Sequence, residues 1–236
     1  MAYYFQAKQL CVGYQNQPLI QNIEIELKKG EILTLIGPNG AGKSTILKSI
    51  ARQLELLGGS VWLEEENLLK LSGRELAKKM AVVFTKRPHT ELMTCEDVVA
   101  TGRYPYTGRF GVLSAKDHEA VQEAMEAVHV LEFRDRDFAR ISDGQRQRIL
   151  LARAICQQPE ILLLDEPTSY LDIKYKLEFL SVLQELQKKL LKKVNNKEAY
   201  DEVADEIFKL REQREKCTVP LLFPLCYIFP YKFTNS

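Results

Sequence analysis

Apolar and polar residues alternate along residues 3–36, a pattern typical of strands with one buried face. A charged turn at residues 28–31 leads into a short, largely apolar run at residues 31–36, which suits a buried strand. The apolar positions of the alternating part are Leu10 and Val12, followed by Ile23, Ile25 and Leu27. We expect an antiparallel hairpin that leads into a parallel sheet.

Four later stretches place apolar residues three and four positions apart, as one face of a helix requires. The first follows residue 44, the second begins with a capping box of Ser114 and Asp117, the third opens near residue 142, and the fourth starts at about Ile173. Their apolar positions are Ile46, Leu47 and Ile50; Val121, Ala124, Met125 and Val128; Leu150, Leu151, Ala154 and Ile155; and Leu177, Leu180, Leu183 and Leu186. Further strands are predicted at residues 60–63, 81–84 and 161–165. This order of elements predicts an α/β fold.

The chain divides into a core, an insertion and a tail. Helical patterns dominate residues 86–156, so we interpret this stretch as a helical subdomain inserted between core strands. A charged amphipathic helix is predicted at residues 197–216. Residues 218–236 are apolar, aromatic and proline-containing, and no part of them is predicted to form a core strand. We expect one domain at residues 1–190 and an atypical tail at residues 191–236.

The composition is that of an ordinary soluble protein, with 45% hydrophobic and 28% charged residues among 236. A formal net charge of +1 lacks the basic bias that nucleic-acid binders usually show, so no nucleic-acid partner is expected. The five cysteines are widely spaced and odd in number, which indicates neither a disulfide framework nor a zinc site. Because no secretory signal and no membrane-length apolar segment is visible, we expect a cytosolic location.

The strongest chemical signal is GPNGAGKST at residues 37–45, which fits the pattern G-x-x-x-x-G-K-[ST] at each fixed position. The glycines allow successive backbone N–H groups to turn inward around phosphate oxygens. Lys43 adds a positive charge, and the hydroxyl of Ser44 can ligate Mg²⁺. The sequence therefore predicts a site for a nucleoside triphosphate.

Two adjacent carboxylates, Asp165 and Glu166, stand at the end of an apolar strand pattern. The carboxyl ends of parallel strands are where open α/β sheets bind ligands. We expect Asp165 to hold Mg²⁺, directly or through water, and Glu166 to polarise the water that attacks the γ-phosphate. A strand that simply ends in an acidic turn is the alternative.

A polar glycine turn at residues 141–148 opens the third predicted helix. A helix N-terminus at which Ser142 and Gly144 lie exposed can bind an anion. Taken alone this signal is weak, because Ser-Asp-Gly is also an ordinary helix N-cap sequence.

Together the three motifs resemble those of the ATP-binding subunits of ABC transporters. The matching segments are residues 37–45 for the Walker A loop, 142–145 for the signature sequence, 161–166 for the Walker B strand and 169–172 for the D-loop. Their order and spacing match over about residues 3–190. The resemblance implies a P-loop NTPase core with a mixed sheet, an antiparallel β part and an inserted α-helical subdomain.

The resemblance also implies a composite site that uses ATP and Mg²⁺. In the implied head-to-tail dimer, Ser142 and Gly144 of one subunit close on the γ-phosphate held by Lys43 and Ser44 of the other. The implied catalytic residue is Glu166, and the implied metal ligands are Ser44 and Asp165. The implied nucleotide-binding residues are Tyr14, Gly37, Asn39, Gly40, Gly42, Lys43, Ser44, Thr45, Ser142, Gly144, Gln145 and Asp172.

Two further segments gain roles from the resemblance. Tyr14 stands where the family often stacks an aromatic ring on adenine, although an ordinary strand aromatic is the alternative. Residues 101–108, TGRYPYTG, look like the helical-subdomain segment of importers for iron-siderophore, haem and cobalamin. In such systems this segment faces the membrane permease, and a simple glycine and proline loop is the alternative.

One part that the family uses to sense Mg²⁺ and the γ-phosphate is missing. The family places a glutamine after the strand that corresponds to residues 81–84, whereas this chain has Thr85 and Lys86 and no glutamine between residues 81 and 95. The hydroxyl of Thr85 could still contribute, but a lysine cannot ligate a cation. Metal sensing is therefore predicted to differ from the family pattern.

A second missing part is the histidine that ends a later core strand in the family and contacts the γ-phosphate. The three histidines, His89, His118 and His129, all precede the signature sequence. The tail takes the place of that strand, which suggests a truncated or rearranged C-terminal end, with a lineage-specific helical tail as the alternative.

We therefore expect an ATP-binding and ATP-hydrolysing subunit of an ABC importer, for substrates of the iron-siderophore type. Its expected partners are a second copy in a homodimer and membrane permease subunits, which would hold it at the cytoplasmic face of the cell membrane. A nucleotide-binding protein with little or no turnover is the alternative.

Overall fold

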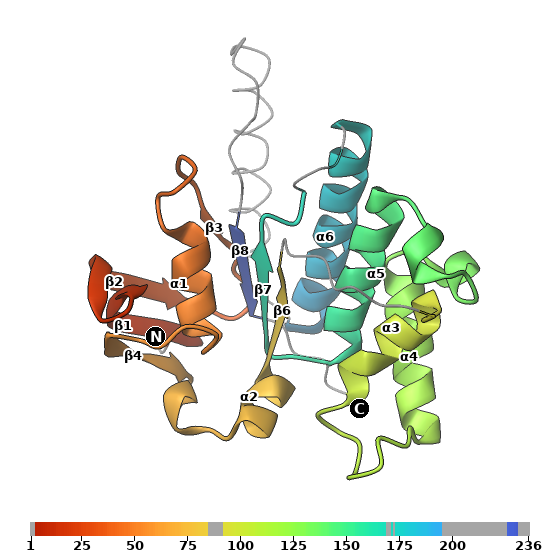
Figure 1. Cartoon of the computed structure of the whole chain (residues 1–236), viewed down its shortest axis with the longest axis horizontal. Helices are drawn as coiled ribbons and strands as arrows, with labels where there is room; N and C mark the ends of the chain where they lie inside the picture. The colour runs from red at the N-terminus through yellow and green to blue at the C-terminus, as the bar shows by residue number, and fades with distance from the viewer. Residues whose placement is uncertain (1–2, 85–91, 169–170, 172, 195–225, 231–236) are drawn as a thin grey trace.

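The structure, a computed structural model, describes residues 3–84, 92–168, 171, 173–194 and 226–230 of the chain (Figure 1). Its strands are β1 (Phe5–Tyr14), β2 (Gln17–Leu27), β3 (Leu33–Leu35), β4 (Gly58–Leu63), β5 (Glu66–Asn67), β6 (Met80–Val83), β7 (Ile161–Asp165) and β8 (Cys226–Pro230). Its helices are α1 (Lys43–Ile50), α2 (Gly73–Lys79), α3 (Cys95–Ala100), α4 (Ala115–Ala127), α5 (Asp143–Cys156) and α6 (Ile173–Val194). Short 3₁₀ helices are η1 (Leu68–Lys70), η2 (Thr101–Arg103), η3 (Leu131–Phe133) and η4 (Phe138–Arg140).

The N-terminal sheet is antiparallel, with the strand order β2-β1-β4-β5. Its hairpin of β1 and β2 aligns Phe5 with Leu27 at one end and Tyr14 with Gln17 at the other. Alternate residues of β1 are buried, as the apolar pattern requires of a sheet with one covered face. The predicted antiparallel hairpin is confirmed, and it brings Tyr14 to the end of β1 that precedes the turn.

The central sheet is mixed, with the strand order β3-β8-β7-β6. Strands β6 and β7 are parallel, whereas β8 is antiparallel to both β3 and β7. In register, Ile228 of β8 pairs with Leu33 on one side and with Leu163 on the other. The expectation that the tail contains no core strand is therefore wrong. The backbone groups of β3 and β7 require partners, and an extended segment supplies them whatever its position in the chain.

Strand β7 is covered on both faces, which explains its continuous apolar run. Ile161 and Leu163 belong to a core that includes residues of β1, β4 and α1. Leu162 and Leu164 belong to a second core that includes residues of α3, α4, α5 and α6. Figure 1 shows the corresponding layers, with α1 and the antiparallel sheet on one side of the central sheet and the group of helices on the other.

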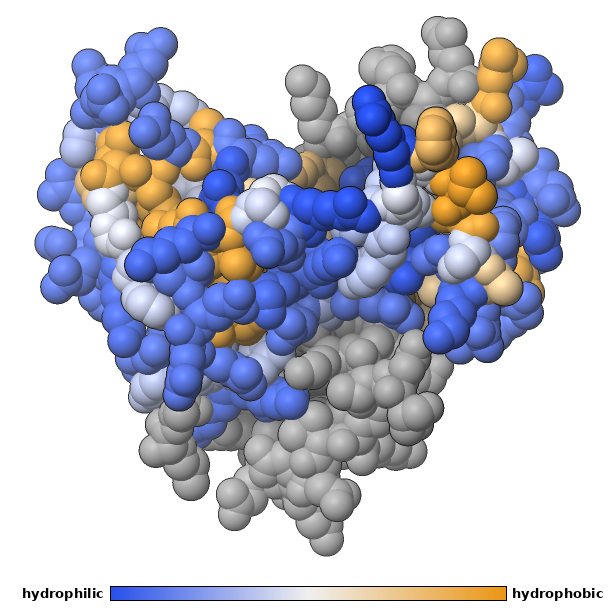
Figure 2. All heavy atoms as spheres, turned by 90° about the horizontal axis from the view of Figure 1, so that it is seen from below, coloured by the Kyte–Doolittle hydropathy of each residue, from blue (hydrophilic) through white to orange (hydrophobic). Residues whose placement is uncertain are grey.

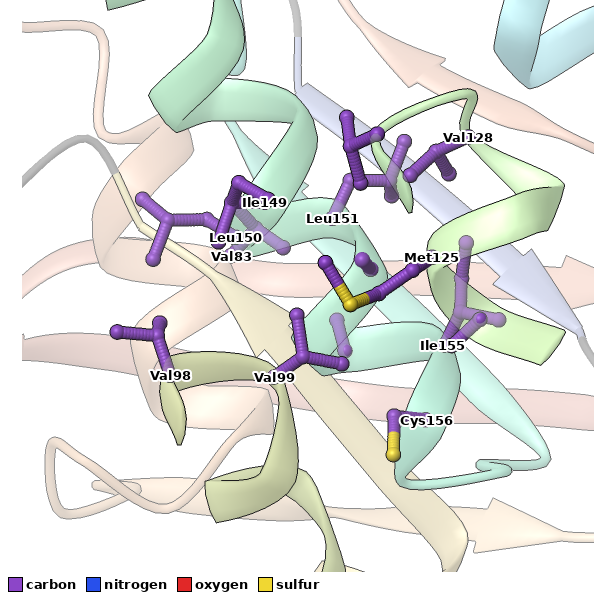
Figure 3. Close-up of a cluster of buried hydrophobic side chains, with 14 of the residues drawn as sticks. Val83, Val98, Val99, Met125, Val128, Ile149, Leu150, Leu151, Ile155 and Cys156 are labelled. Atoms are coloured by element: carbon purple, nitrogen blue, oxygen red, sulfur yellow. The ribbon is translucent and has the colours of Figure 1, made fainter. Parts of the chain in front are cut away.

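The helices α3, α4 and α5 pack on one another around small and medium apolar side chains. Figure 3 shows Val98 and Val99 of α3, Met125 of α4, and Leu151 and Ile155 of α5 in this cluster, and all five are buried. The helices predicted for this part of the chain are confirmed. Helix α5 therefore packs on both α3 and α4.

One predicted helix face needs correction. Leu183 and Leu186 of α6 are buried, but Leu177 is 46% exposed. A strict three-residue repeat drifts by about 60° per step around a helix with about 3.6 residues per turn, so Leu177 and Leu186 lie on opposite sides. Helix α6 also continues through Val194, past the domain boundary expected near residue 190.

Three remaining expectations concern the surface and the tail. Among the helices that the structure describes, none combines the length and apolar character that a membrane span needs. Cys11, Cys95 and Cys156 carry free thiols. The helix expected at residues 197–216 lies outside the described residues.

Candidate functional site

The predicted phosphate loop joins β3 to α1. Gly40 and Gly42 have φ angles of +80° and +87°, a region that side-chain-bearing residues rarely adopt. A Cβ atom on Gly42 would lie 2.6 Å from Cδ1 of Ile20 in β2, so that side chain would have to shift. Gly42 is also the N-cap of α1 and offers no side-chain acceptor to its first turn. The loop therefore presents a helix N-terminus that suits an anion, with Asn39 exposed beside it.

Lys43 is held inside this loop. Its side chain is almost entirely buried, and its ammonium group donates hydrogen bonds to the carbonyl oxygens of Gly37 and Pro38, each at 2.8 Å. A buried charge needs polar partners, and the loop backbone supplies them. A phosphate oxygen could replace either carbonyl as the acceptor, because an ammonium group has three donors that rotate freely.

The first turn of α1 contacts the end of β7. The hydroxyl of Ser44 donates a 2.6 Å hydrogen bond to Oδ1 of Asp165, which is the last residue of β7 and only 3% exposed. This short distance is typical of a hydroxyl that donates to a carboxylate. Hydroxyl and carboxylate oxygens are ligands that Mg²⁺ prefers, so this pair of side chains fits the ion.

Glu166 follows β7 in an unusual backbone conformation. Its φ angle is +49°, in the left-handed region that non-glycine residues seldom occupy. Such strain costs on the order of 1–3 kcal/mol and is concentrated at functional sites. The strand ends at Asp165, as predicted, but no residue pattern in the sequence indicates the left-handed conformation of Glu166.

Tyr14 lies beside the first turn of α1. Its hydroxyl is 2.9 Å from Oγ1 of Thr45, and 51% of the residue is exposed. The hydrogen bond fixes the hydroxyl end of the side chain, while the ring remains available for a planar group to stack on it. The structure thus brings together the predicted residues Tyr14, Lys43, Ser44, Thr45 and Asp165.

The polar glycine turn at residues 141–148, which we call the signature turn, differs from our expectation in the exposure of one residue. Ser142 is exposed and caps α5, because its hydroxyl accepts from the backbone N–H of Gln145 while the side chain of Gln145 accepts from the backbone N–H of Ser142. Gly144 is buried, and a Cβ atom on it would lie 3.0 Å from two ring atoms of Tyr175 in α6. The expected exposure of Gly144 is wrong, because the first turn of α6 covers it.

The signature turn and the phosphate loop lie apart in one chain. Helices α1 and α5 stand on opposite sides of the central sheet (Figure 1). The contact between Tyr175 and Gly144 could not be predicted, since Tyr175 belongs to no motif that the sequence presents. Asp172, Thr85 and Lys86 lie outside the described residues.

Comparison with known proteins identifies the family. The model of a family described as "ABC transporter" matches residues 20–169. The chain belongs to the ABC transporter family. Its phosphate loop, its acidic strand end and its mixed sheet are therefore those of an ABC ATP-binding domain, as the sequence predicted.

Several ABC transporter proteins are similar to the chain over about three quarters of its length. The ATP-binding protein MJ0873 of Methanocaldococcus jannaschii is 47% identical over 177 residues, which are 75% of this chain and 61% of that protein. The iron(3+)-hydroxamate import ATP-binding protein FhuC of Bacillus subtilis is 39% identical over 77% of this chain and 67% of its own. The ferric enterobactin transport ATP-binding protein FepC of Escherichia coli is 35% identical over 77% and 67%. The chain thus spans about two thirds of the length of these ABC proteins.

A solved ABC structure has the same fold. The ADP conformation of MJ1267, an ATP-binding cassette of an ABC transporter, superimposes with a TM-score of 0.71 over 80% of this chain and 78% of its own, at 20% identity. At this identity the likeness concerns the fold alone. It supports the fold class predicted from the sequence.

Proposed function

We propose that the chain is the ATP-binding and ATP-hydrolysing subunit of an ABC importer. The observation that carries the proposal is the 2.6 Å hydrogen bond between Ser44 and Asp165, which are 121 positions apart in the sequence. It joins the loop that would hold the phosphates to the strand end that would hold the metal. Each motif alone has an ordinary structural explanation, but their contact at one sheet edge favours a single site.

The residues of this chain supply positioning and charge. Lys43 offers its ammonium group to the phosphates, the N-terminus of α1 offers backbone N–H groups, and Tyr14 offers a ring to the base. Bound Mg²⁺ would neutralise phosphate charge from a position beside Ser44 and Asp165. Glu166 would accept a proton from the water that attacks the γ-phosphate.

A second copy of the chain would complete the site. The exposed hydroxyl of Ser142 keeps its hydrogen for a γ-phosphate oxygen, since the capping box uses only its oxygen as an acceptor. The two ligand-binding parts lie on opposite sides of the central sheet, so one chain does not bring them to one nucleotide. Head-to-tail pairing would place the α5 N-terminus of each copy over the phosphate loop of the other.

The proposed substrate class is an iron-siderophore-type compound, as the names of FhuC and FepC describe for those relatives. The proposed second partner is a membrane permease, which would hold the chain at the cytoplasmic face of the membrane. Figure 2 shows apolar surface on the side of the helices α3, α4 and α5. Between α3 and α4, Tyr104, Phe110 and Val112 are largely exposed. Exposed apolar side chains of this kind suit a protein partner.

A protein that binds nucleotide with little turnover is the second candidate. It is favoured by the order of the chain, in which all three histidines precede the signature turn. It is also favoured by β8, which is antiparallel between β3 and β7. An antiparallel strand ends at the opposite edge of the sheet from a parallel one, so Pro230, the last residue of β8, pairs with the first residue of β7 and lies at the edge away from Asp165.

ATP titration of the purified chain with and without Mg²⁺, together with phosphate release, tests both candidates. We expect Mg²⁺-dependent binding and release that falls by about 100-fold in Glu166→Gln, because a general base contributes at least that factor. Absence of ATP binding would overturn both candidates. Binding with release no faster than that of Glu166→Gln would favour the second. Permease genes beside this gene would support the import role.

A further inference from the structure

Residues 101–107, which follow α3, form hydrogen bonds with the C-terminal end of α5. Nη1 of Arg103 donates to the carbonyl oxygen of Cys156 at 2.9 Å and to Oε1 of Gln158 at 3.1 Å. Nε of Arg103 donates to Oδ1 of Asp117 in α4 at 2.8 Å, and both side chains of this ion pair are buried. One guanidinium group therefore joins the ends of α3 and α5 to the first turn of α4.

Two residues near Arg103 make further contacts with this end of α5. The hydroxyl of Tyr106 donates to the carbonyl oxygen of Gln157 at 3.0 Å, and the ring of Tyr106 lies 3.9 Å from the guanidinium of Arg103. A Cβ atom on Gly102 would lie 2.3 Å from the carbonyl oxygen of Arg153, so only glycine allows the backbones to approach this closely. We refer to Gly102, Arg103, Tyr106 and Asp117 as the α5 clamp.

Further hydrogen bonds connect the C-terminal end of α5 and residues 101–107 to α2 and β6. Nε of Arg74 in α2 donates to the carbonyl oxygen of Pro105 at 2.8 Å, and Nη2 of Arg74 donates to that of Thr107. Nε2 of Gln157 donates to the carbonyl oxygen of Met80 at 2.7 Å, where β6 begins. These contacts anchor the clamped end of α5 to α2 and β6.

The other end of α5 is where Ser142 caps the helix. There Nη1 of Arg146 donates to Oδ1 of Asp143 at 2.7 Å, Nη2 of Arg146 donates to the carbonyl oxygens of Ala139 and Ile141 at 3.2 Å each, and Tyr175 of α6 packs on Gly144. These contacts join the first turn of α5 to the segment that precedes it and to α6, whereas the contacts at the C-terminal end reach α4 and β6. The helix has 14 residues and is therefore about 21 Å long. A tilt of about 5° around the clamped end would move Ser142 by about 2 Å, which exceeds the tolerance of a hydrogen bond.

We propose that Arg103 is a positioning residue for the signature turn. By fixing the C-terminal end of α5, the clamp sets the direction of the helix and thus the place of Ser142, some 20 Å away by the same helix rise. A buried ion pair adds little net stability, but its fixed geometry suits a role in positioning. The inference rests on the proposed function for its catalytic consequence, although the mechanical link itself does not require ATP.

Hydrogen exchange of the nucleotide-free chain tests the mechanical link. Arg103→Lys keeps the positive charge but lacks the planar fork that binds Asp117 and Cys156 together. We expect exchange about 5-fold faster at both ends of α5, in residues 142–148 and 153–158, with residues 149–152 still protected. The milder Tyr106→Phe should show the same pattern more weakly, and it serves if Arg103→Lys does not fold. Faster exchange confined to residues 153–158 would overturn the proposal.

Kinetics on the same variants test the catalytic consequence. Arg103→Lys should lower kcat by about 10-fold, because small misplacement of a positioning group has large effects on rate, while Kd for ATP stays within 2-fold of wild type. Arg134→Lys, which alters an exposed pair with Glu96 in the same group of helices, is the matched control and should change neither constant. An unchanged kcat in Arg103→Lys would overturn the positioning role. If the wild-type chain has no ATPase activity, the proposed ATP hydrolysis is wrong. The hydrogen-exchange pattern would still test whether the α5 clamp positions the signature turn.

Discussion

The side chains of Ser44 and Asp165 are joined by a hydrogen bond of 2.6 Å from Oγ to Oδ1, although 121 positions separate them in the sequence. Ser44 belongs to the first turn of α1, and Asp165 ends β7. The contact therefore couples the two elements that surround the proposed phosphate and metal positions. Because the two oxygens lie within hydrogen-bonding distance of each other, little rearrangement is needed for them to share one cation.

Ser44→Ala should weaken the Mg²⁺ dependence of ATP binding. The substitution removes one oxygen of the proposed metal site and leaves Asp165 buried without that donor. We expect the ratio of ATP affinities with and without Mg²⁺ to fall by about 10-fold, the effect of losing a hydrogen bond to a charged group. Calorimetric titration in Mg²⁺ and in EDTA measures this ratio.

Ser49→Ala is the matched control for this measurement. Ser49 lies on the same helix, and its buried hydroxyl has no hydrogen-bond partner in the part of the chain that the structure describes. Its replacement should leave the Mg²⁺ dependence unchanged. A Ser44→Ala variant that behaves like Ser49→Ala would contradict the proposed metal site.

Tyr14 should contribute to ATP binding mainly through its ring. Tyr14→Ala removes both the ring and the hydroxyl bond to Thr45, and we expect ATP affinity to fall by about 10-fold, as for the loss of one base-stacking contact. Tyr14→Phe keeps the ring and should lose no more than about 3-fold, because a neutral hydrogen bond adds little net free energy. Fluorescence titration with a labelled ATP analogue measures both.

The control for Tyr14 is Tyr3→Ala. Tyr3 is also an exposed tyrosine, but it precedes the opposite end of β1 and should not affect affinity. If Tyr14→Ala binds ATP as tightly as Tyr3→Ala does, Tyr14 is an ordinary strand aromatic.

The ion pair of Arg103 and Asp117 should make stability depend on pH in acid. Burial raises the pKa of the Asp117 carboxyl, but hydrogen bonds from Ser114 and Arg103 outweigh burial and hold that pKa below its ordinary value. A pKa that is lower in the folded state than in the unfolded state stabilises the fold above the unfolded pKa of about 3.9. This contribution is lost as the pH falls through the folded pKa.

Asp117→Asn should therefore lower the free energy of unfolding by a constant amount between pH 5 and 8, and by less below about pH 4. Urea unfolding of both chains across this range measures the difference. Glu96→Gln, at the exposed pair with Arg134, should show a much smaller difference at every pH. A difference between wild type and Asp117→Asn that grows as the pH falls below about 4 would mean that folding raises the pKa of Asp117 instead of lowering it.

Local sequence signals predicted α1, the start of α4 and the end of β7, because each signal depends on neighbouring residues. The loop at residues 37–45 needs glycines at fixed spacing, and the capping box of Ser114 and Asp117 needs only one turn of helix. The end of β7 could be predicted because a strand buried on both faces has a continuous apolar run. These features do not depend on tertiary contacts with distant parts of the chain.

Features that depend on tertiary contacts could not be predicted in this way. Gly144 is buried because Tyr175, 31 positions later, packs on it. Leu177 is exposed because the face of α6 that packs on the core carries Tyr175 and Phe179, and a residue two positions from each lies on the other side of the helix. The position of β8 depends on the unpaired backbone groups of β3 and β7, which no residue pattern within residues 218–236 indicates.

The position of β8 leads to a further prediction, because its backbone pairs with both β3 and β7. Proline has no N–H group, and in the middle of a sheet it removes a ladder hydrogen bond, at a cost of about 3 kcal/mol or more in a regular element. Ile228→Pro should therefore lower the free energy of unfolding by about that amount. It should also weaken ATP binding, since β3 leads directly into the phosphate loop. Ile228→Val keeps the N–H group and should leave both properties close to wild type. A stable Ile228→Pro chain with unaltered ATP affinity would mean that β3 and β7 hold the loop without β8.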